Sequence, residues 1–413
     1  MIVDSLRKRT RLALLWMNLS HEPFVILYTL LPFIIRKDLE ASLLQISILT
    51  ALRPVLPVFS FYWSANLSRH RLRTNLMGAW ILARLPFLFV PWVHDVWYLI
   101  FCCGVYELFN KSGIPALIEI LKINIPKKLR EKTYSLYFVF AFIESIFLGI
   151  FIAGLLDAQP SMWRWLCGVA ALIALSSVFV QFRVPIAVDS APQVRERLSL
   201  SKRIVKPWKD AFHMLKTYRD FFHFQCAFMI GGFSLMLITP SLALFCADIL
   251  QLPHSTMVAG RSILMGIGIV ASTALWKSAL SQKPVIQLTQ WILIGFALYP
   301  LALVLSHFHI GWFYIAFILY GIAQAGSHIL WNLSGTLFVE NADSSAFSRV
   351  NILMIGLRGL IAPALGGILC TFLGPEKTLL IGAAICSCGI IYAIAKRKQI
   401  AEAPSIPVPV ETK

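Results

Sequence analysis

Charged residues are scarce in this sequence, and their scarcity excludes a soluble protein. Of the 413 residues, 14% are charged and 58% are hydrophobic, and the mean hydropathy is +0.73. A soluble chain of this length needs a polar surface that this composition cannot supply. The composition therefore predicts a polytopic membrane protein.

Acidic residues are scarcer than basic ones, with 20 Asp and Glu against 37 Lys and Arg and a formal net charge of +17. Such an excess could indicate nucleic-acid binding, but the basic residues lie in short segments between apolar runs. That distribution follows the positive-inside rule for cytoplasmic loops rather than the footprint of a nucleic-acid site. We therefore expect no nucleic-acid partner.

The sequence also lacks motifs for metals, cofactors and ATP. Its eight cysteines lie within or beside apolar runs, and no pair has metal-ligand spacing with a matching His or Cys pair. No Walker loop is present, so direct use of ATP is unsupported. The basic start has no small-residue cleavage site after it, and we interpret the first apolar run as a membrane span. We expect no metal, no cofactor and no enzymatic activity.

Long apolar runs fill most of the chain, and a membrane-spanning helix needs about 20 such residues. The connections between runs alternate between basic and weakly charged, except that the loop at 336–349 carries Glu340 and Asp343 against Arg349. This pattern predicts an all-α polytopic membrane protein with about 12 transmembrane helices and both termini in the cytoplasm. The runs fall at 12–35, 43–65, 75–95, 96–121, 133–156, 163–182, 221–247, 255–279, 286–306, 309–335, 346–371 and 377–395.

One extended polar break divides the runs into two halves. It predicts an N-terminal six-helix bundle at 1–182, a basic cytoplasmic linker at 183–220 and a C-terminal six-helix bundle at 221–395. Apolar residues at helical spacing in the linker indicate a short amphipathic helix, which either lies on the inner leaflet or is solvated. The Pro-rich segment at 396–413 is expected to be a disordered cytoplasmic tail.

The two halves repeat under a shift of 213 residues. The shift places Ala153–Leu156 on Gly366–Leu369 and Arg164–Leu166 on Lys377–Leu379, and it places the fourth and fifth runs on the tenth and eleventh. Two six-helix units related by a parallel repeat indicate a transporter with a central cavity.

These features resemble the major facilitator superfamily over nearly the whole chain. Gly154–Asp157 followed by Trp163–Trp165 is similar to the family's junction between helices 5 and 6, and Lys128–Lys132 is similar to its basic loop between helices 4 and 5. The segment 65–73 keeps the bases of the family's loop 2–3 but lacks its glycine and its acid. The resemblance implies two six-helix bundles and transport by alternating access, without the usual form of the cytoplasmic gating lock.

Charged residues inside apolar runs mark the candidate site, because a charge in the bilayer is costly and usually faces a cavity or a partner. Glu107 and Lys111 share one stripe of the fourth run in the favourable order for a helical ion pair. They either bind substrate and switch partners with a proton, or form a static pair. The shift places a second stripe on Gln324, His328 and Asn332, and the resemblance implies that both stripes line the cavity. His328 is either a proton sensor or an ordinary hydrogen-bonding residue.

Other charges at membrane depth suggest the kind of substrate and the coupling. Arg53 and Arg358, with the lysine of the fourth run, favour an anionic or zwitterionic substrate, since Arg binds carboxylate or phosphate in a bidentate manner. Glu22 is the leading proton-carrier candidate and Glu144 the second, because burial favours the protonated form of a carboxyl group. Either acid could instead be neutralised permanently by a buried arginine such as Arg53 or Arg84.

The sequence therefore predicts a secondary active transporter that moves a small anionic or zwitterionic organic solute by alternating access, coupled to protons. We expect a monomeric, multi-pass protein of a bacterial inner (plasma) membrane, whose partners are a small-molecule substrate, protons and the lipid bilayer. The alternatives are a proton-driven exporter of amphipathic compounds, a polytopic membrane enzyme or a receptor on a transporter-like fold. The buried bases, and the absence of the glycine–proline pattern that many drug–proton antiporters carry in helix 5, argue against the exporter.

Overall fold

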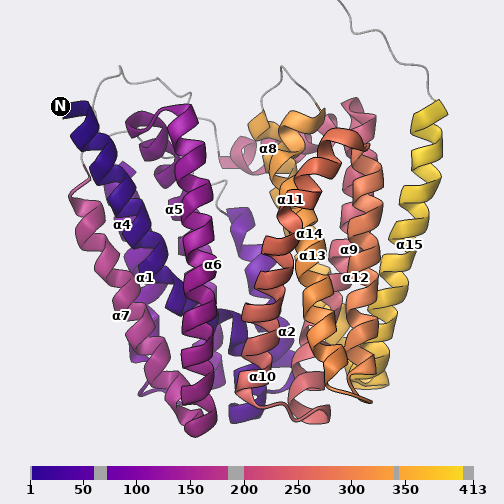
Figure 1. Ribbon diagram of the computed structural model, residues 1–413, viewed down its shortest axis with the longest axis horizontal. Helices are drawn as coiled ribbons and strands as arrows, with labels where there is room; N and C mark the ends of the chain where they lie inside the picture. The colour runs from indigo at the N-terminus through magenta and orange to yellow at the C-terminus, as the bar shows by residue number, and fades with distance from the viewer. Residues whose placement is uncertain (1, 60–71, 185–199, 339–343, 403–413) are drawn as a thin grey trace, which may run out of the picture.

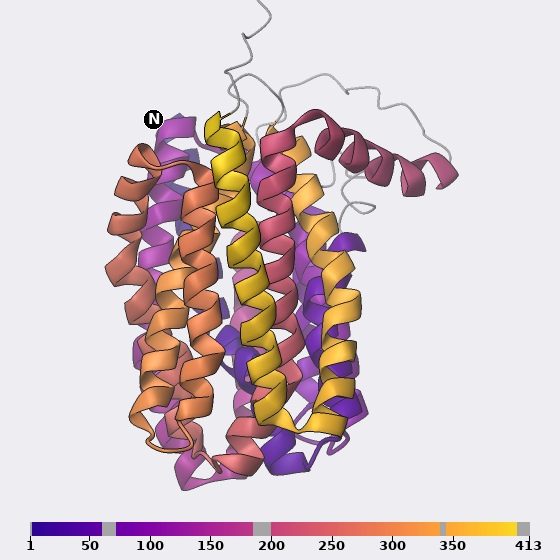
Figure 2. The ribbon, with the colours of Figure 1, turned by 90° about the vertical axis from the view of Figure 1, so that its right-hand side faces the viewer.

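The structure is a computed structural model that describes residues 2–59, 72–184, 200–338 and 344–402, and all regular structure in these ranges is helical. Long helices run side by side in two groups, α1 to α7 in one and α9 to α15 in the other (Figure 1). The first helix begins and the last helix ends at the same end of the molecule, where α8 lies across the helix ends (Figures 1 and 2). We call this the linker end and the other the outer end. The predicted all-α fold of two bundles is confirmed.

The N-terminal bundle contains the helices that precede the linker. Its second helix begins with a capping box, in which the Ser42 hydroxyl accepts from the Gln45 amide at 3.3 Å and the Gln45 side chain accepts from the Ser42 amide at 2.8 Å. The elements are α1 (Ile2–Leu39), α2 (Leu43–Val55), η1 (Leu56–Phe59), α4 (Leu72–Arg84), η3 (Leu85–Phe89), α5 (Val96–Asn124), α6 (Lys127–Ala158), η4 (Pro160–Met162) and α7 (Trp163–Phe182).

The C-terminal bundle follows α8 (Leu200–Thr217), the helix within the predicted linker. Two short π-helical segments, η5 and η6, interrupt its first two spans, and such bulges are frequent at functional sites. The elements are α9 (Arg219–Leu244), η5 (Phe245–Ile249), α10 (His254–Val258), η6 (Ala259–Leu264), α11 (Met265–Gln282), α12 (Val285–Leu305), α13 (Gly311–Phe338), α14 (Ser344–Leu373) and α15 (Pro375–Glu402).

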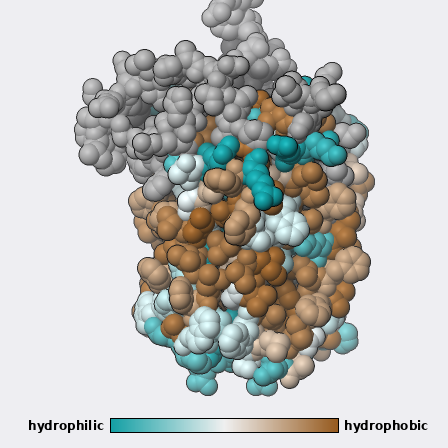
Figure 3. Space-filling model, turned by 90° about the vertical axis from the view of Figure 1, so that its left-hand side faces the viewer, coloured by the Kyte–Doolittle hydropathy of each residue, from teal (hydrophilic) through white to brown (hydrophobic). Residues whose placement is uncertain are grey.

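The surface of the molecule fits a bilayer. Among the described residues, eight helices are long and apolar enough to span a membrane, and α2 with η1, α4 with η3, α5 and α6 occupy the remaining predicted runs. Large apolar side chains such as Phe147, Phe179 and Leu275 are more than two-thirds exposed, at 70%, 76% and 71%. Figure 3 shows apolar surface across the middle of one face and polar residues toward both ends. The exposed apolar belt is explained by contact with lipid.

The helix bounds repeat with the period read from the sequence. Moving α5 by 213 residues gives 309–337, and α13 spans Gly311–Phe338. The same shift moves α6 to 340–371, against Ser344–Leu373 for α14. The helices α5 and α6 therefore have counterparts in α13 and α14 at equivalent positions along the sequence of the second half.

One expected boundary is wrong. The helix α15 continues to Glu402 and includes the basic residues Lys396, Arg397 and Lys398, at the start of the segment 396–413 that the sequence predicts to be a disordered tail. Lys, Arg and Ala are good helix formers, and basic residues are favourable near a helix C-terminus, so the helix extends beyond its apolar run. Residues 403–413 of the expected tail, and 185–199 of the expected linker, lie outside the described residues.

The two halves contact each other mainly where α2 packs along α14 and where α6 packs against α10 and η6. Glycines on α14 let the backbones approach closely, because a Cβ at these positions would meet atoms of α2 and η1. The opposed residues are Gly356 and Val58, Gly359 and Pro54, and Gly367 and Ser47.

Candidate functional site

A buried carboxylate on α5 forms the centre of the site. Glu107 is only 2% exposed, and the Tyr28 hydroxyl of α1 donates a hydrogen bond of 2.9 Å to its Oε1. Lys111, one turn further along α5, and Arg53 of α2 both interact electrostatically with it. The ion pairs of the described residues do not include one between Glu107 and Lys111, so the expected helical pair is not a direct contact. The tyrosine hydroxyl is the direct partner of the carboxylate.

Arg53 connects this centre to the C-terminal half. Its side chain is exposed in the structure although it lies in a membrane helix, and it interacts electrostatically with Lys111 on one side. On the other side it interacts with Arg261 of η6 and with His328 of α13. Three bases from three elements, Lys111, Arg53 and Arg261, are therefore linked through Arg53, and Glu107 is the acid with which Arg53 and Lys111 interact. This local excess of positive charge suits an anionic group.

Aromatic and amide side chains on α12 and α13 lie beside Arg261. Gln324 donates from Nε2 to the Tyr320 hydroxyl at 2.5 Å, and the Tyr320 ring stacks on Tyr299 at 4.4 Å with an interplanar angle of 23°. Both tyrosines interact electrostatically with Arg261. The side chain of Asn332, the last residue of the second predicted stripe, lies outside the described residues.

Arg358, predicted as a third substrate-binding base, packs inside the C-terminal bundle. Its Nη1 donates to the Phe228 carbonyl at 2.8 Å, and its guanidinium lies 5.7 Å from the centre of the Trp331 ring. Gly232 provides the room, because a Cβ there would clash with the guanidinium. The described contacts of Arg358 thus belong to α9 and α13, and its role as a substrate ligand stays a prediction.

The two predicted proton carriers lie together. Glu22 of α1 interacts electrostatically with Glu144 of α6. One carboxylate oxygen of Glu144, Oε2, is buried without a hydrogen-bond partner among the described residues. The described contacts of Arg53 are with α5, η6 and α13 rather than with these acids. The structure therefore pairs acid with acid, whereas the alternative to proton carriage drawn from the sequence was an arginine that neutralises them.

Sequence reasoning missed a polar network beside the centre. Arg84 is fully buried, and its guanidinium lies 3.4 Å from the centre of the Trp80 ring, a cation–π contact. Its Nη2 lies 3.1 Å from Nδ1 of His21 and donates to Asn110 at 3.2 Å. The Tyr106 hydroxyl lies 3.1 Å from Nε2 of the same histidine. The sequence signalled a buried charge at Arg84, but its partners lie on two other helices.

A second polar cluster closes the outer end of the molecule. Arg36, near the end of α1, binds Asp248 of η5 through two nitrogens, with Nε–Oδ1 at 2.9 Å and Nη2–Oδ2 at 2.7 Å. Lys37 donates to the Leu252 carbonyl. Both contacts join the N-terminal half to the C-terminal half.

His254 completes this cluster at the start of α10. It is 3% exposed, and its Nε2 lies 3.2 Å from Asp38 Oδ2 while its Nδ1 lies 4.0 Å from Asp157 Oδ1. Asp157 also accepts from the Ser255 amide at 3.1 Å. We call Arg36, Lys37, Asp38, Asp157, Asp248 and His254 the outer latch. Every described hydrogen bond between the halves lies in or beside it, so the halves are held together at the outer end.

Comparison with protein families gives one match. The family model described as Major Facilitator Superfamily matches residues 23–357. A search of curated protein sequences finds no match.

Solved transporter structures share this arrangement of helices at low sequence identity. The nucleoside transporter NupG aligns with a TM-score of 0.68 at 15% identity and covers 95% of this chain and 99% of its own. The peptide transporter POT in complex with sulfate gives 0.73 at 10%, covering 95% and 94%. A bacterial homolog of the human lysosomal transporter Spinster, inward-facing and unoccupied, gives 0.64 at 13%, covering 98% and 99%. At these identities the likeness concerns the fold alone.

Proposed function

This chain belongs to the Major Facilitator Superfamily, a family of transporters rather than enzymes. We propose that it transports a small anionic or zwitterionic organic solute and that a proton gradient drives this transport. Membership makes it a multi-pass membrane protein and a secondary transporter. The nature of the solute, the coupling to protons, the monomeric state and residence in a bacterial inner (plasma) membrane are the parts that we propose.

The observation that carries the proposal is the position of Arg53, which interacts with Glu107 and Lys111 in its own half and with Arg261 in the other. Unpaired positive charge is costly at membrane depth, so a bound carboxylate or phosphate lowers the cost of keeping these bases there. Arg offers a planar fork and Lys a point charge, a combination suited to a small anion. An ammonium group on a zwitterion would have Glu107 as its partner.

The acid pair supplies a route for coupling. Two carboxyl groups in one low-dielectric place repel each other when both are ionised, so a proton bound to either relieves the repulsion. Binding and release of one proton would therefore switch Glu22 of α1 and Glu144 of α6 between a protonated pair and a fully ionised pair. Because α1 also carries Tyr28, the partner of Glu107, protonation of the acids and occupation of the central bases act on one helix.

The outer latch supplies one of the two gates that alternating access requires. With the halves joined at the outer end, the centre in this conformation is separated from that side, which fits an inward-facing state. Opening to the outside must break the bidentate contact of Arg36 with Asp248 and the contacts of His254, and contacts at the linker end must replace them.

Uptake into proteoliposomes tests this proposal. Labelled carboxylates, phosphate esters, amino acids, peptides and neutral sugars are offered with and without an inward proton gradient. We expect gradient-dependent uptake of a compound that carries at least one anionic group. Uptake of neutral sugars alone, or flux indifferent to the gradient, would contradict the charge argument or the coupling argument respectively.

A matched pair of lysine variants separates the site from general effects of charge. Lys111→Gln removes a central base, whereas Lys277→Gln removes an exposed base at the linker end of α11. We expect the first to raise the KM for the anionic substrate about tenfold or more and the second to leave it unchanged. Gradient-driven efflux of amphipathic cations, insensitive to Lys111→Gln, would instead support the exporter.

A further inference from the structure

The helix within the linker presents an exposed apolar stripe. Val205, Trp208 and Phe212 of α8 are 46%, 40% and 73% exposed, and their spacing of three and four residues places them on one face. We call these three residues the α8 stripe. A second face packs on the C-terminal bundle, where Ala211 is buried and Leu215 is partly buried against the core. Packing of α8 on the bundle therefore accounts for the second face but not for the stripe.

The end of α8 lies where a membrane span begins. The helix ends at Thr217 and α9 begins at Arg219, so one residue separates α8 from a helix long and apolar enough to cross a membrane. Phe222, in the first turn of α9, is exposed, so apolar surface that fits lipid begins within that turn. From there α8 runs across the helix ends and extends sideways beyond the edge of the bundle, at the upper right of Figure 2. A helix in this position lies along the membrane surface.

Basic residues accompany the α8 stripe. The sequence of α8 contains five Lys and Arg residues and one Asp. Lys209 and Lys216 lie about one turn before and one turn after Phe212, and both are exposed. In helices of this kind the apolar side chains enter the boundary of the acyl chains, while lysines reach the lipid phosphates. The charge distribution of the sequence places this end in the cytoplasm, where the inner leaflet contains anionic lipids.

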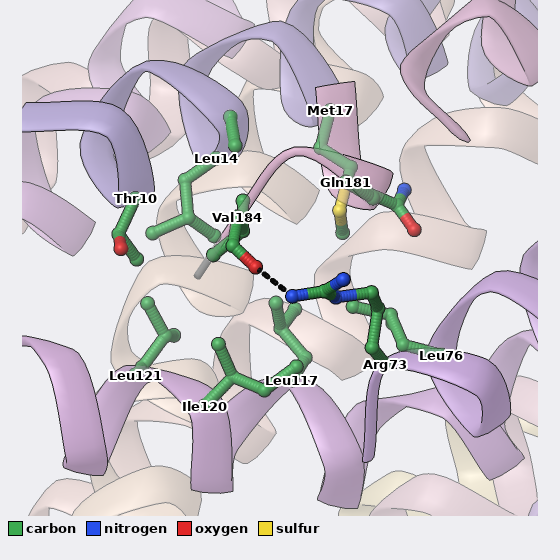
Figure 4. Close-up of a pocket in the computed structure, with 11 residues that line it drawn as sticks. Thr10, Leu14, Met17, Arg73, Leu76, Leu117, Ile120, Leu121, Gln181 and Val184 are labelled. Atoms are coloured by element: carbon green, nitrogen blue, oxygen red, sulfur yellow. Dashed lines mark hydrogen bonds between the residues drawn. The ribbon is translucent and has the colours of Figure 1, made fainter. Parts of the chain in front are cut away.

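The bases at the linker end are not all available to lipid. Arg73, near the start of α4, donates from Nη2 to the Val184 carbonyl at 2.7 Å and points into the N-terminal bundle (Figure 4). Within the described part of the chain, the hydrogen bonds and ion pairs include none from Lys209 or Lys216. These two lysines are therefore available to groups outside the protein, such as phosphates of the membrane surface.

We propose that α8 lies on the inner leaflet, with the α8 stripe among the acyl chains and Lys209 and Lys216 at the phosphates of anionic phospholipids. The sequence left this helix either on the leaflet or solvated, and the exposed stripe at the start of a span favours the leaflet. The ring of Tyr218, just after α8, lies 5.3 Å from that of Phe347 on α14. Lipid-bound α8 would therefore hold the linker ends of α9 and α14 at the membrane surface. This inference does not depend on the substrate or on proton coupling.

Fluorescence quenching of the full-length protein in lipid nanodiscs tests the proposal. A nitrobenzoxadiazole probe is attached at Phe212→Cys or, on the neighbouring face, at His213→Cys, with Cys226 and Cys388 replaced by serine. We expect lipids with a nitroxide on the acyl chain to quench the first probe and aqueous iodide to quench the second. Equal quenching of both probes by iodide would show a solvated helix and overturn the proposal. Protection of the first probe from both quenchers would show that protein covers the stripe and would overturn it as well.

Two matched pairs of lysine substitutions test the role of charge. Lys209→Gln with Lys216→Gln removes the bases beside the stripe, whereas Lys277→Gln with Lys283→Gln removes two exposed bases at the linker end of α11. Each base near an anionic surface strengthens the attraction about fivefold. In nanodiscs containing phosphatidylglycerol, the first pair should therefore raise iodide quenching of the probe at Phe212→Cys at least about threefold, and the second should not. Equal effects of the two pairs, or equal quenching in discs of phosphatidylcholine alone, would overturn the assignment to an anionic surface.

Discussion

Neutralising Asp248 should shift the molecule toward its outward-open state. Asp248→Asn keeps the shape of the side chain but removes the charge that Arg36 binds through two nitrogens at 2.7 and 2.9 Å. Arg36 keeps its bond of 2.9 Å to the Ala41 carbonyl on its own side, so the variant weakens only the link between the halves.

The size of the shift follows from exposure and geometry. The side chains of Arg36 and Asp248 are 27% and 37% exposed, so water screens part of their attraction. Exposed ion pairs contribute about 0.2–1 kcal/mol, and bidentate geometry places this pair at the upper end. A loss of about 1 kcal/mol changes the ratio of closed to open outer ends about fivefold. The contacts of His254 and Lys37 remain and keep a closed population.

Double electron–electron resonance measurements of the distance between the two halves report the ratio of closed to open outer ends. Spin labels at His94→Cys and Phe308→Cys lie on exposed outer-end positions of the two halves, in a background where the exposed Cys388 and the half-buried Cys226 are serine. Asp248→Asn should increase the longer-distance population.

The matched control for this measurement is Glu376→Gln. It breaks the contact of 3.2 Å with His307, which lies at the same end but within one half. An unchanged distribution in Asp248→Asn, or an equal shift in Glu376→Gln, would refute the assignment of the latch as a gate.

Three further outcomes are expected. Glu22→Gln should abolish gradient-driven uptake while substrate exchange persists, and loss of both in folded protein would indicate a structural acid. Tyr28→Phe removes the donor to the buried carboxylate of α5, which costs about 1–3 kcal/mol and should slow uptake about tenfold at normal expression; an unchanged rate would contradict it. Gly232→Ala forces a Cβ into the Arg358 guanidinium at a cost of roughly 1–3 kcal/mol and should lower the thermal unfolding midpoint, whereas Gly154→Ala, with open space around it, should not.

The helical arrangement could be predicted because a bilayer imposes a fixed apolar length and a charge asymmetry on every span. The shift of 213 residues also predicted the positions of α13 and α14 from α5 and α6 to within a few residues. The extension of α15 was not predicted, because hydropathy marks where a span leaves the lipid and gives no information on where a helix ends.

The sequence predicted which charged side chains lie inside the membrane, but it did not predict which residues they contact. Burial of Glu107 follows from its place in an apolar run, yet its hydrogen bond comes from Tyr28, 79 residues earlier. Arg36 and Asp248 lie 212 residues apart, each in a connection between apolar runs that carries little net charge, and no local sequence spacing relates them. A single sequence shows on which face of its helix a charged residue lies. The residues that it contacts on a neighbouring helix depend on how the two helices are rotated relative to each other, which the sequence alone does not show.

The glycine face of α14 has a mechanical consequence. Val58, Pro54 and Ser47 lie directly against Gly356, Gly359 and Gly367, where a Cβ would come within 2.0, 2.4 and 2.2 Å of them. Close-packed surfaces yield little, so a side chain at any of these three positions would push α14 away from α2. The separation of the two halves along this contact is therefore set by three absent side chains.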